Sequence, residues 1–266
     1  MKLDSRIGEL ETLKELLTEF VEPQSKHRVV QISVQERLFP IQDLKGPKEY
    51  AQVLYDVFQC HRWLYEHAHI LHRDISVGNI MFRKHRSRIY GVLNDFDLAC
   101  KLSEITSDPL VDHRLGTKPF MALDVLAPTW TGGKKALYRH DLESLFYTIL
   151  CIACQYNGTK LEPKTSPFQS WFEGSLAQVY QFKTNDILLE DTWYAPVTGR
   201  FIQFVPWLED MRKLVRVGYL SRPTVANTDY ARQFNYDTLG GVVSHRTFRA
   251  IMSRFNRATL EERSSA

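Results

Sequence analysis

The chain has 266 residues, 44% hydrophobic and 24% charged, which is enough for a soluble globular protein with one large core. Its formal charge of +3, from 34 basic and 31 acidic side chains, argues against a dedicated nucleic-acid binder, because such proteins carry a clustered basic surplus. No apolar run reaches the roughly 18 residues of a membrane span, and four scattered cysteines fit a reducing compartment, so we expect an intracellular protein, cytoplasmic or nuclear.

The first predicted elements are a helix over residues 6–21 and a strand at residues 30–34. The helix follows from leucines that recur at helical spacing, and Pro23 stops it. A longer helix over residues 50–67 shows the i, i+3, i+4, i+7 apolar pattern. It opens at Pro47, because proline is tolerated in the first turn of a helix.

The middle of the chain predicts two short strands and a buried helix. The strands, at residues 80–82 and 90–93, flank the basic stretch RKHRSR, which we expect to form a solvated turn. Residues 141–156 are apolar on almost every face, which is typical of a buried helix. Cys151 and Cys154 lie in that helix without a second pair, so we interpret them as core thiols.

The last third of the chain is less regular. Residues 157–200 contain many glycines and prolines around one short helical stretch, and a helix with one apolar side follows over residues 201–220. From residue 221 the sequence is polar and weakly patterned, so we expect a partly disordered extension there.

Two short segments contain the residues with chemical potential, HRDISVGN after the long helix and NDFD after the second strand. Phosphoryl transfer to a hydroxyl needs a carboxylate that accepts or orients the hydroxyl proton, and oxygen ligands for the metal ions that bridge the phosphates. Asp74, Asn79 and Asp95 supply such groups, and the intervening strands would return Asp95 to the side of the other two. Two carboxylates and an amide oxygen suit Mg²⁺ and do not suit zinc.

Four segments in this order resemble the protein-kinase signature set: HRDISVGN, NDFD, GTKPFMALD at 116–124 and HDLESLFYTIL at 140–150. The chain is most similar to the fungal-type protein kinases, and its HDLESL segment is also similar to the casein kinase 1 branch. The resemblance covers roughly residues 28–220. It implies an α+β, protein-kinase-like fold with a mainly helical C-lobe and an incomplete N-lobe.

The resemblance also implies a division of the chain. We expect an N-lobe remnant of one helix and one strand at residues 1–34, a C-lobe with the hinge at residues 35–220, and an extension at residues 221–266. The backbone of the hinge residues would face the adenine of ATP, and these residues are Gln35, Glu36 and Arg37.

Each matching residue has a role that the resemblance implies. Asp74 would be the catalytic base, and Asn79 and Asp95 would hold Mg²⁺ and, through it, ATP. Arg73 would pair with a phosphate or an acid of the activation segment. Thr117 would contact Asp74 and shape the substrate site.

Further matches imply supporting roles. His72 would pack under the Asp95 loop, and Asp141 would accept hydrogen bonds from backbone N–H groups of the catalytic loop. Asp124 stands where the family places the glutamate of its APE motif, and it would need an arginine partner that the sequence does not identify. The activation segment would cover residues 95–124, and its candidate phosphosites are Ser103, Thr106 and Ser107.

The chain departs from the family pattern at several positions. No G-x-G-x-x-G loop and no V-A-I-K lysine precede the hinge, Ser76 replaces a lysine of many serine/threonine kinases, and Asp97 replaces the glycine of DFG. Positioning and electrostatics supply nearly all of kinase catalysis, so these departures predict a weak or inactive enzyme. We interpret the chain as a truncated product or an incomplete gene model of a longer enzyme.

Three functions remain open at this point. The first is a serine/threonine protein-kinase-like phosphotransferase that uses ATP and Mg²⁺ on an unknown protein substrate, and the second is a pseudokinase that serves as a binding or scaffold module. The third is a small-molecule kinase of the aminoglycoside or choline type. The GTKPFMALD segment argues against the third, because such an enzyme has no use for a peptide-docking activation segment. No nucleic-acid or membrane partner is expected.

Overall fold

The computed structural model describes residues 36–105, 115–129, 135–157, 160–161, 168–189, 195–225 and 228–263. The chain divides into two compact units, Met1–Arg37 and Leu38–Ala266. The helix predicted over residues 6–21, the strand predicted at residues 30–34 and the hinge residue Gln35 lie outside the described residues. All elements below belong to the second unit.

The predicted long helix is present as α2 (Pro47–Trp63), with proline in its first turn as expected, and a π-helical turn, Leu64–Ala68, extends it. Its apolar side is fully buried and includes Tyr50, Val53, Leu54, Val57 and Phe58. Next to it lies a three-stranded antiparallel sheet in the order β1-β3-β4. The strands are β1 (Phe39–Pro40), β3 (Ile80–His85) and β4 (Arg88–Leu93).

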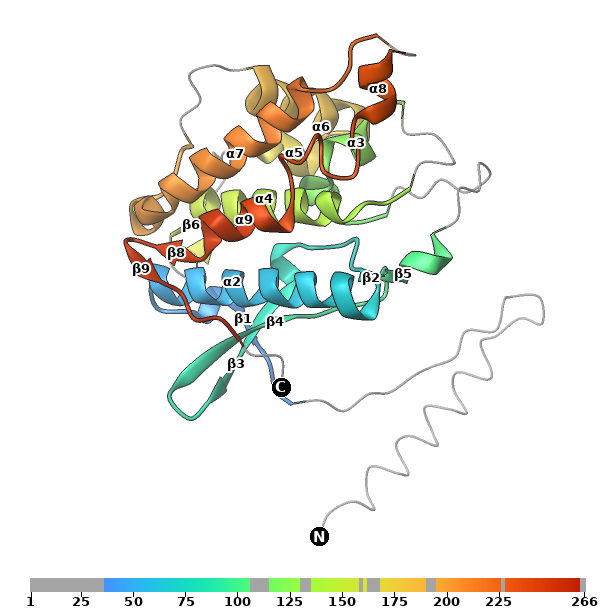
Figure 1. The fold of residues 1–266 in the computed structure, drawn as a ribbon. Helices are drawn as coiled ribbons and strands as arrows, with labels where there is room; N and C mark the ends of the chain where they lie inside the picture. The colour runs from blue at the N-terminus through green and yellow to red at the C-terminus, as the bar shows by residue number, and fades with distance from the viewer. Residues whose placement is uncertain are drawn as a thin grey trace, which may run out of the picture. The chain divides into compact units, whose positions relative to one another are not determined.

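The basic stretch between the two predicted strands mostly continues the hairpin. Arg83, Lys84 and His85 pair with residues of β4, so only residues 86–87 form the turn, and the predicted six-residue turn is wrong. Charged side chains are compatible with this ribbon because they lie at its exposed end, where Lys84 also stacks over Phe82, 5.6 Å from its ring centroid. The hairpin packs across α2 (Figure 1).

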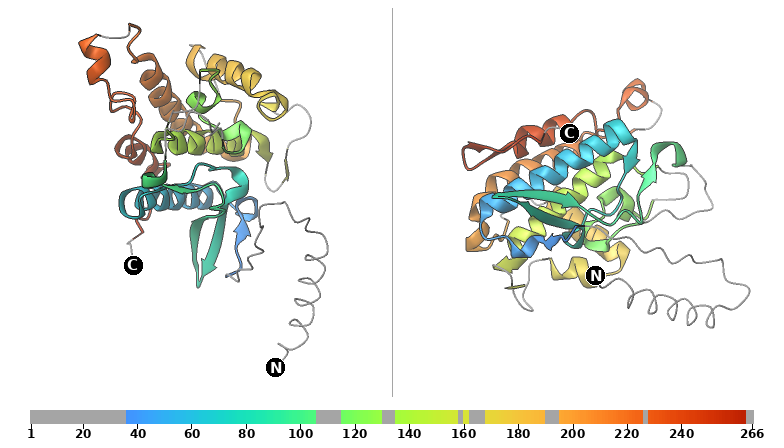
Figure 2. Two further views of the ribbon diagram at one scale, coloured as in Figure 1. Left: turned by 90° about the vertical axis from the view of Figure 1, so that its right-hand side faces the viewer. Right: turned by 90° about the horizontal axis from the view of Figure 1, so that it is seen from below.

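The predicted buried helix forms the centre of the unit. It is α4 (Tyr138–Gln155), and residues 139–155 are all buried, including Cys151 and Cys154, which are core thiols as predicted. α7 (Val205–Leu220) packs against α4 with one apolar side, after a 3-10 helix at Gly199–Phe204. Figure 2 shows α4 lying between α2 and α7.

The segment between α4 and α7 contains more regular structure than predicted. α5 (Gln169–Glu173), α6 (Leu176–Lys183) and a π-helical segment, Thr184–Leu189, follow one another there. Ser175 caps α6 in a reciprocal capping box with Gln178, a sequence signal that our prediction did not use. The remaining short elements are β2 (Ile70–Leu71), β5 (Cys100–Lys101), α3 (Leu123–Leu126), β6 (Tyr156–Asn157) and β7 (Lys160–Leu161).

The carboxy-terminal residues differ from the predicted weakly patterned extension. They form α8 (Asp229–Gln233), α9 (His245–Met252), β8 (Arg254–Phe255) and β9 (Ala258–Thr259). Leu239, Val243, Phe248, Met252 and Phe255 are buried in the same core as α4 and α7. These apolar residues lie in turns and short elements, so they leave no long periodic signal in the sequence.

The end of the described chain crosses α2. Arg263 makes a bidentate ion pair with Asp56, from Nε to Oδ1 at 2.9 Å and from Nη2 to Oδ2 at 3.0 Å. The same carboxylate accepts a hydrogen bond from the N–H of Gly91 at 2.9 Å. Asp56 therefore links α2, β4 and the end of the described chain. No helix in the described residues is long and apolar enough to cross a bilayer.

A substitution at Gly91 tests the packing of the hairpin on α2. A Cβ atom at this position would lie 2.3 Å from the carbonyl oxygen of Val53 and 2.9 Å from Cβ of Asp56. We expect Gly91→Ala to lower the free energy of unfolding by about 3 kcal/mol, at the upper end of the cost of overpacking, as measured by urea denaturation. A Cβ at Gly199 meets no atom within 4 Å, so Gly199→Ala is the control and should leave stability nearly unchanged. Equal stability of the two variants would contradict this packing.

Candidate active site

The segment HRDISVGN runs from the end of β2 to the start of β3, and a buried carboxylate on α4 fixes its path. Asp141 is 3% exposed and lies in the first turn of α4. Its Oδ2 accepts the N–H of His72 and its Oδ1 accepts the N–H of Arg73, both at 3.0 Å. Arg73 has a φ of 65°, a conformation that costs free energy in a residue other than glycine. The two hydrogen bonds hold the loop in this shape.

Two histidines form a chain of hydrogen bonds that begins at Asp141. Nε2 of His61 lies 3.1 Å from Oδ2 of Asp141, and Nε2 of His245 lies 3.1 Å from Nδ1 of His61. Burial raises the pKa of the Asp141 carboxyl, but the hydrogen bond from His61 and the N–H of His72 outweigh burial and hold the pKa below its ordinary value. The sequence did not reveal His61, which stands 80 positions before Asp141.

The carboxylate of Asp74 is clamped from two sides. Its Oδ1 accepts both the N–H of Thr117 at 2.6 Å and the hydroxyl of Thr117 at 2.7 Å. Among the described residues, the only donor to its Oδ2 is Nδ2 of Asn79, at 3.0 Å. Each carboxylate oxygen has room for about two hydrogen bonds, so Oδ2 retains one site for a further donor. The expected contact between Thr117 and Asp74 is present.

The side-chain amide of Asn79 is oriented by the same loop. Its Nδ2 also donates to the backbone oxygen of Asp74 at 2.8 Å. Because both hydrogen bonds use the NH₂ group, the amide cannot be flipped without losing them. Oδ1 has no hydrogen-bond partner within the described ranges, so it can serve as a metal ligand.

The hairpin β3–β4 places the loop of Asp95 beside Asn79. Ile80 pairs with Leu93, and the N–H of Asn94 donates to the backbone oxygen of Asn79 at 2.9 Å. Asp95 follows in the left-handed region, with a φ of 63°, and its exposed carboxylate accepts the N–H of Asp97 at 3.3 Å through Oδ1. Oδ2 of Asp95 therefore has no hydrogen-bond partner among the residues that the structure describes.

His72 joins the catalytic loop to the loop of Asp95, as expected. Its Nε2 donates to the backbone oxygen of Asn94 at 3.0 Å, and its Nδ1 accepts the N–H of Asp74 at 3.3 Å. Its ring meets Phe96 edge to face, with 4.9 Å between the ring centroids. Burial lowers the pKa of His72, so the ring is neutral and acts as a structural link.

Arg73 does not meet an acid within the described residues. Its Nε donates to the backbone oxygen of Leu98 at 2.7 Å, which joins the catalytic loop to the start of the expected activation segment. Residues 106–114 of that segment lie outside the described residues, and they include the candidate phosphosites Thr106 and Ser107. Ser103 lies in a 3-10 helix, Leu102–Glu104. The phosphate or acid partner of Arg73 stays a prediction.

Gly116 brings the segment of Thr117 onto the catalytic loop. It has a φ of +123°, and a Cβ there would lie 2.9 Å from the backbone oxygen of Arg73. Only glycine combines this angle with so close an approach. The next turn is braced by Lys183, which is fully buried and donates to the backbone oxygen of Met121 at 2.7 Å.

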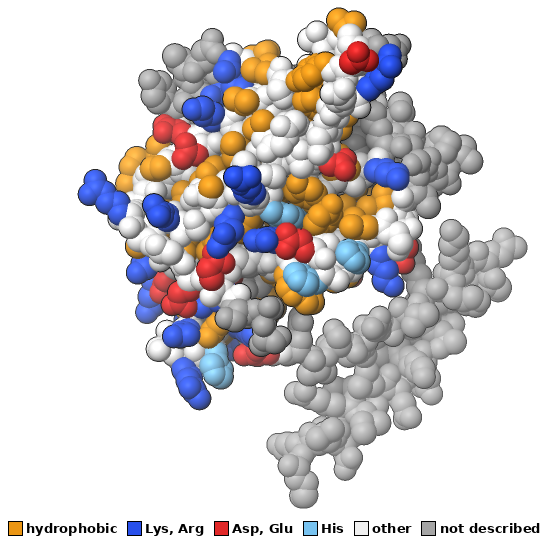
Figure 3. Space-filling view, in the orientation of Figure 1, with side chains coloured by type: hydrophobic (Ala, Val, Ile, Leu, Met, Phe, Trp, Pro, Cys, Tyr) orange, Lys and Arg blue, Asp and Glu red, His pale blue; other side chains and the backbone are white. Residues whose placement is uncertain are grey.

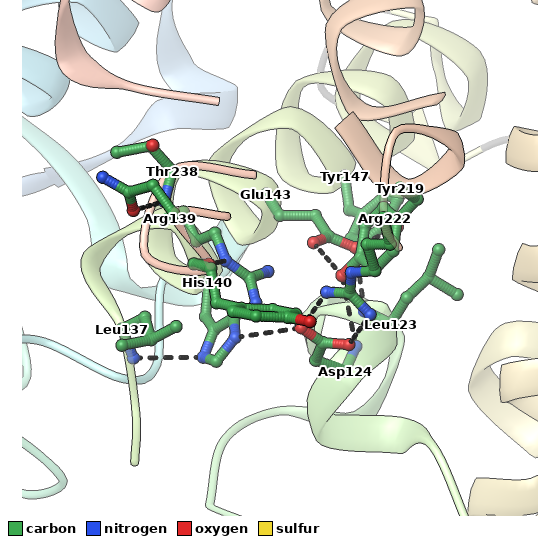
Figure 4. Close-up of polar contacts among 12 residues, drawn as sticks. Leu123, Asp124, Leu137, Arg139, His140, Glu143, Tyr147, Tyr219, Arg222 and Thr238 are labelled. Atoms are coloured by element: carbon green, nitrogen blue, oxygen red, sulfur yellow. Dashed lines mark hydrogen bonds and ion pairs between the residues drawn. The ribbon is translucent and has the colours of Figure 1, made fainter. Parts of the chain in front are cut away.

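Asp124 has two arginine partners that the sequence did not identify (Figure 4). Arg139, in the first turn of α4, contacts Oδ2 through Nη2, and Arg222, just after α7, binds both carboxylate oxygens at 2.8 and 2.5 Å. Burial raises the pKa of Asp124, but His140 and both arginines hold it well below its usual range. Arg139 stands two positions before Asp141 in YRHDLESL, so the motif contained one of the two partners.

Glu143 completes the same network. Its Oε1 accepts the N–H of Leu123 at 2.8 Å and the hydroxyl of Tyr147 at 2.6 Å, and its Oε2 accepts the hydroxyl of Tyr219 at 2.8 Å. The HDLESL segment thus holds both the catalytic loop, through Asp141, and α3, through Glu143.

The hinge prediction gains no further support. Glu36 and Arg37 are described, whereas Gln35 is not, and all three belong to the first unit. Their role at the adenine stays a prediction.

Asp141→Asn tests the anchoring of the catalytic loop. The amide keeps one acceptor, so one N–H of the loop loses its partner, and we expect a loss of about 1–3 kcal/mol of unfolding free energy at pH 7. The folded-state pKa of Asp141 is lowered, so its contribution is complete above the unfolded value of about 4 and fades as the pH falls below it. Urea denaturation from pH 3 to pH 7 should show the gap between wild type and variant closing in acid.

The control for this experiment is Asp210→Asn, because Asp210 is exposed on α7. It should match wild type at every pH. If Asp141→Asn were as stable as the control at pH 7, the carboxylate would not anchor the loop.

Comparison with known proteins assigns the family. The sequence profile described as "Fungal protein kinase" matches residues 12–154, more than half of the chain and including the catalytic loop, the Asp95 loop and most of α4. No curated protein matches the chain significantly. The match agrees with the resemblance carried by the four motifs and with the mixed architecture of helices and small sheets. The chain belongs to the fungal protein kinase family.

Proposed function

We propose that this protein transfers the γ-phosphoryl group of ATP to a hydroxyl of a protein. The observation that carries the proposal is the arrangement around Asp74, whose Oδ1 is filled by Thr117 while Oδ2 keeps one open acceptor site. A carboxylate fixed in this way can orient a hydroxyl and accept its proton. The family assignment supports kinase chemistry in general.

The residues next to Asp74 fit a magnesium ion. The free Oδ1 of Asn79 and the exposed carboxylate of Asp95 are hard oxygen ligands, and Mg²⁺ is usually bound by one or two such protein groups together with phosphates and water. Bound Mg²⁺ would neutralise charge on the phosphates.

The side chains of the protein would then position the acceptor hydroxyl and take up its proton. The acceptor hydroxyl donates to Oδ2 of Asp74, and Thr117 and Asn79 keep the carboxylate from rotating. Asp141 accepts the N–H groups of His72 and Arg73, and the ring of His72 accepts the N–H of Asp74, so the backbone leading into Asp74 is fixed. Such preorganisation is the main source of catalysis in phosphoryl transfer.

The segment after Gly116 favours a peptide over a small molecule as the acceptor. It runs from Thr117 to α3 and is held by Lys183, Glu143 and the arginines of Asp124. A rigid segment next to Asp74 supports a surface on which a peptide docks. A serine or threonine hydroxyl is the acceptor that we propose.

A pseudokinase is the second candidate, because the sequence lacks groups that bind the phosphates of ATP in many kinases. The sequence contains no G-x-G-x-x-G loop and no V-A-I-K lysine before the hinge, and Ser76, where many kinases have lysine, is 5% exposed. One charge contact to a reacting phosphate is worth about 3–4 kcal/mol, so binding without transfer is the expected outcome if no other cation replaces these groups.

Two substitutions separate binding from transfer. Asp95→Ala removes a metal ligand, so we expect Mg²⁺-dependent binding of ATP to be lost in isothermal titration calorimetry. Asp74→Asn removes the proton acceptor but no ligand, so it should keep that binding and lose about 10²–10⁴-fold in phosphorylation rate, measured with radiolabelled ATP and a generic protein acceptor such as casein.

Asp97→Ala is the control, because Asp97 is an exposed acid two residues from Asp95 and its side chain has no part in the proposed site. It should bind ATP like wild type. Binding without any transfer in the wild type would favour a nucleotide-binding pseudokinase, and absence of both Mg²⁺-dependent binding and transfer in the wild type would rule out the phosphotransferase and leave the scaffold.

A further inference from the structure

A pocket lies outside the candidate active site, between the end of α2 and α9. It has a volume of about 360 Å³ and is lined by Arg62, Glu66, His245, Arg246, Arg249, Ala250 and Ser253. Figure 3 shows basic side chains gathered around a histidine and an acidic side chain on the face where α9 passes α2. No residue of the pocket belongs to the catalytic loop or to the proposed metal site.

The charges of the pocket favour an anion. Three arginines and one glutamate line it, and a second glutamate, Glu262, pairs with Arg249, so one positive charge is left over, that of Arg246. Burial and the neighbouring His61 and Arg62 lower the pKa of His245 to about 3, so this residue is uncharged at neutral pH. A phosphorylated side chain carries about 1.5–2 negative charges at pH 7, so it is attracted to this positive charge and can accept hydrogen bonds from the neighbouring guanidinium groups.

The arginines offer free donors toward such a group. Arg62 uses Nε for its ion pair with Glu66 at 2.8 Å, and Arg249 uses Nε and Nη2 for Glu262 at 3.1 and 2.8 Å. Both Nη atoms of Arg62 have no partner in the described part of the chain, whereas Arg249 also forms a side-chain hydrogen bond with Tyr55. The ion pairs thus orient two guanidinium groups without using all of their donors.

Arg246 is the most available of the three. It is exposed at the start of α9 and makes no hydrogen bond or ion pair with any described residue. The planar fork of a guanidinium matches phosphate oxygens in pairs. The hydroxyl of Ser253, which also lacks a side-chain partner among the described residues, can add a neutral donor.

We propose that this pocket binds a phosphorylated serine or threonine of a protein segment. The choice of a phosphoprotein rests on the proposed function, because phosphoproteins are the products of that reaction. A single surface hollow of this size fits one phosphorylated side chain better than it fits nucleic acid, which needs a basic surface along many phosphates.

Fluorescence anisotropy with a labelled phosphoserine peptide tests the proposal. The probe is a fluorescein-labelled seven-residue peptide of glycine and alanine with one central phosphoserine, and its twin carries serine. Binding is measured in the full chain with Asp74→Asn, so the result does not depend on whether transfer occurs. The phosphopeptide should bind at least about tenfold more tightly than its twin, since charge-assisted hydrogen bonds to arginine are lost in the twin.

Substitutions locate the site. Arg246→Ala should weaken phosphopeptide binding about tenfold and Arg246→Glu should abolish it. Arg88→Ala and Arg88→Glu are the matched controls, because Arg88 is an exposed arginine of β4 that does not line the pocket, and each should bind like the parent. Unchanged thermal unfolding of the Arg246 variants shows that they fold.

Three results would overturn the proposal. One is equal binding of the two peptides. Another is an equal effect of the Arg246 and Arg88 substitutions, which would indicate attraction to the overall positive charge. The third is competition by a glutamate peptide as strong as by the phosphopeptide, which would assign the pocket to carboxylates. Loss of kinase activity with phosphopeptide binding intact would refute only the proposed function.

Discussion

A single buried carboxylate, that of Asp141, is the constraint on which the candidate site depends. Its two oxygens hold consecutive N–H groups of the catalytic loop, one of them in a left-handed residue that is unfavourable without such support. A buried charge is costly unless it is fully hydrogen-bonded, and His61 supplies the remaining partner. The position of Asp74 therefore follows from the core of the protein, because Asp141 lies on its most buried helix.

The hairpin β3–β4 positions the two residues that we propose as metal ligands. It starts just after Asn79 and ends two residues before Asp95, so antiparallel pairing brings the backbones of the two loops together. His72 closes the arrangement, because its two ring nitrogens bond to Asn94 and to Asp74. The site is thus a set of short connections between rigid elements, which is how loop residues acquire defined geometry.

Local sequence patterns predicted some elements and site residues and did not predict others. α2 and α4 were predictable because their apolar patterns are long, and Asp74, Asn79 and Thr117 were predictable from motifs. Arg222 and His61 were not predicted, because each pairs with a residue far along the chain and nothing local marks it. The ordered carboxy-terminal residues were missed for a similar reason, since their burial depends on α4 and α7 and not on their own periodicity.

The central claim is that Asn79 and Asp95 hold one magnesium ion with the nucleotide while Asp74 faces the acceptor. A crystal structure of the chain with Mg²⁺ and a non-hydrolysable ATP analogue tests it directly. The account predicts Oδ1 of Asn79 and a carboxylate oxygen of Asp95 at about 2.0–2.1 Å from the same ion, which also contacts a phosphate. An ion bound elsewhere, or the two oxygens pointing away from each other with nucleotide present, would contradict it.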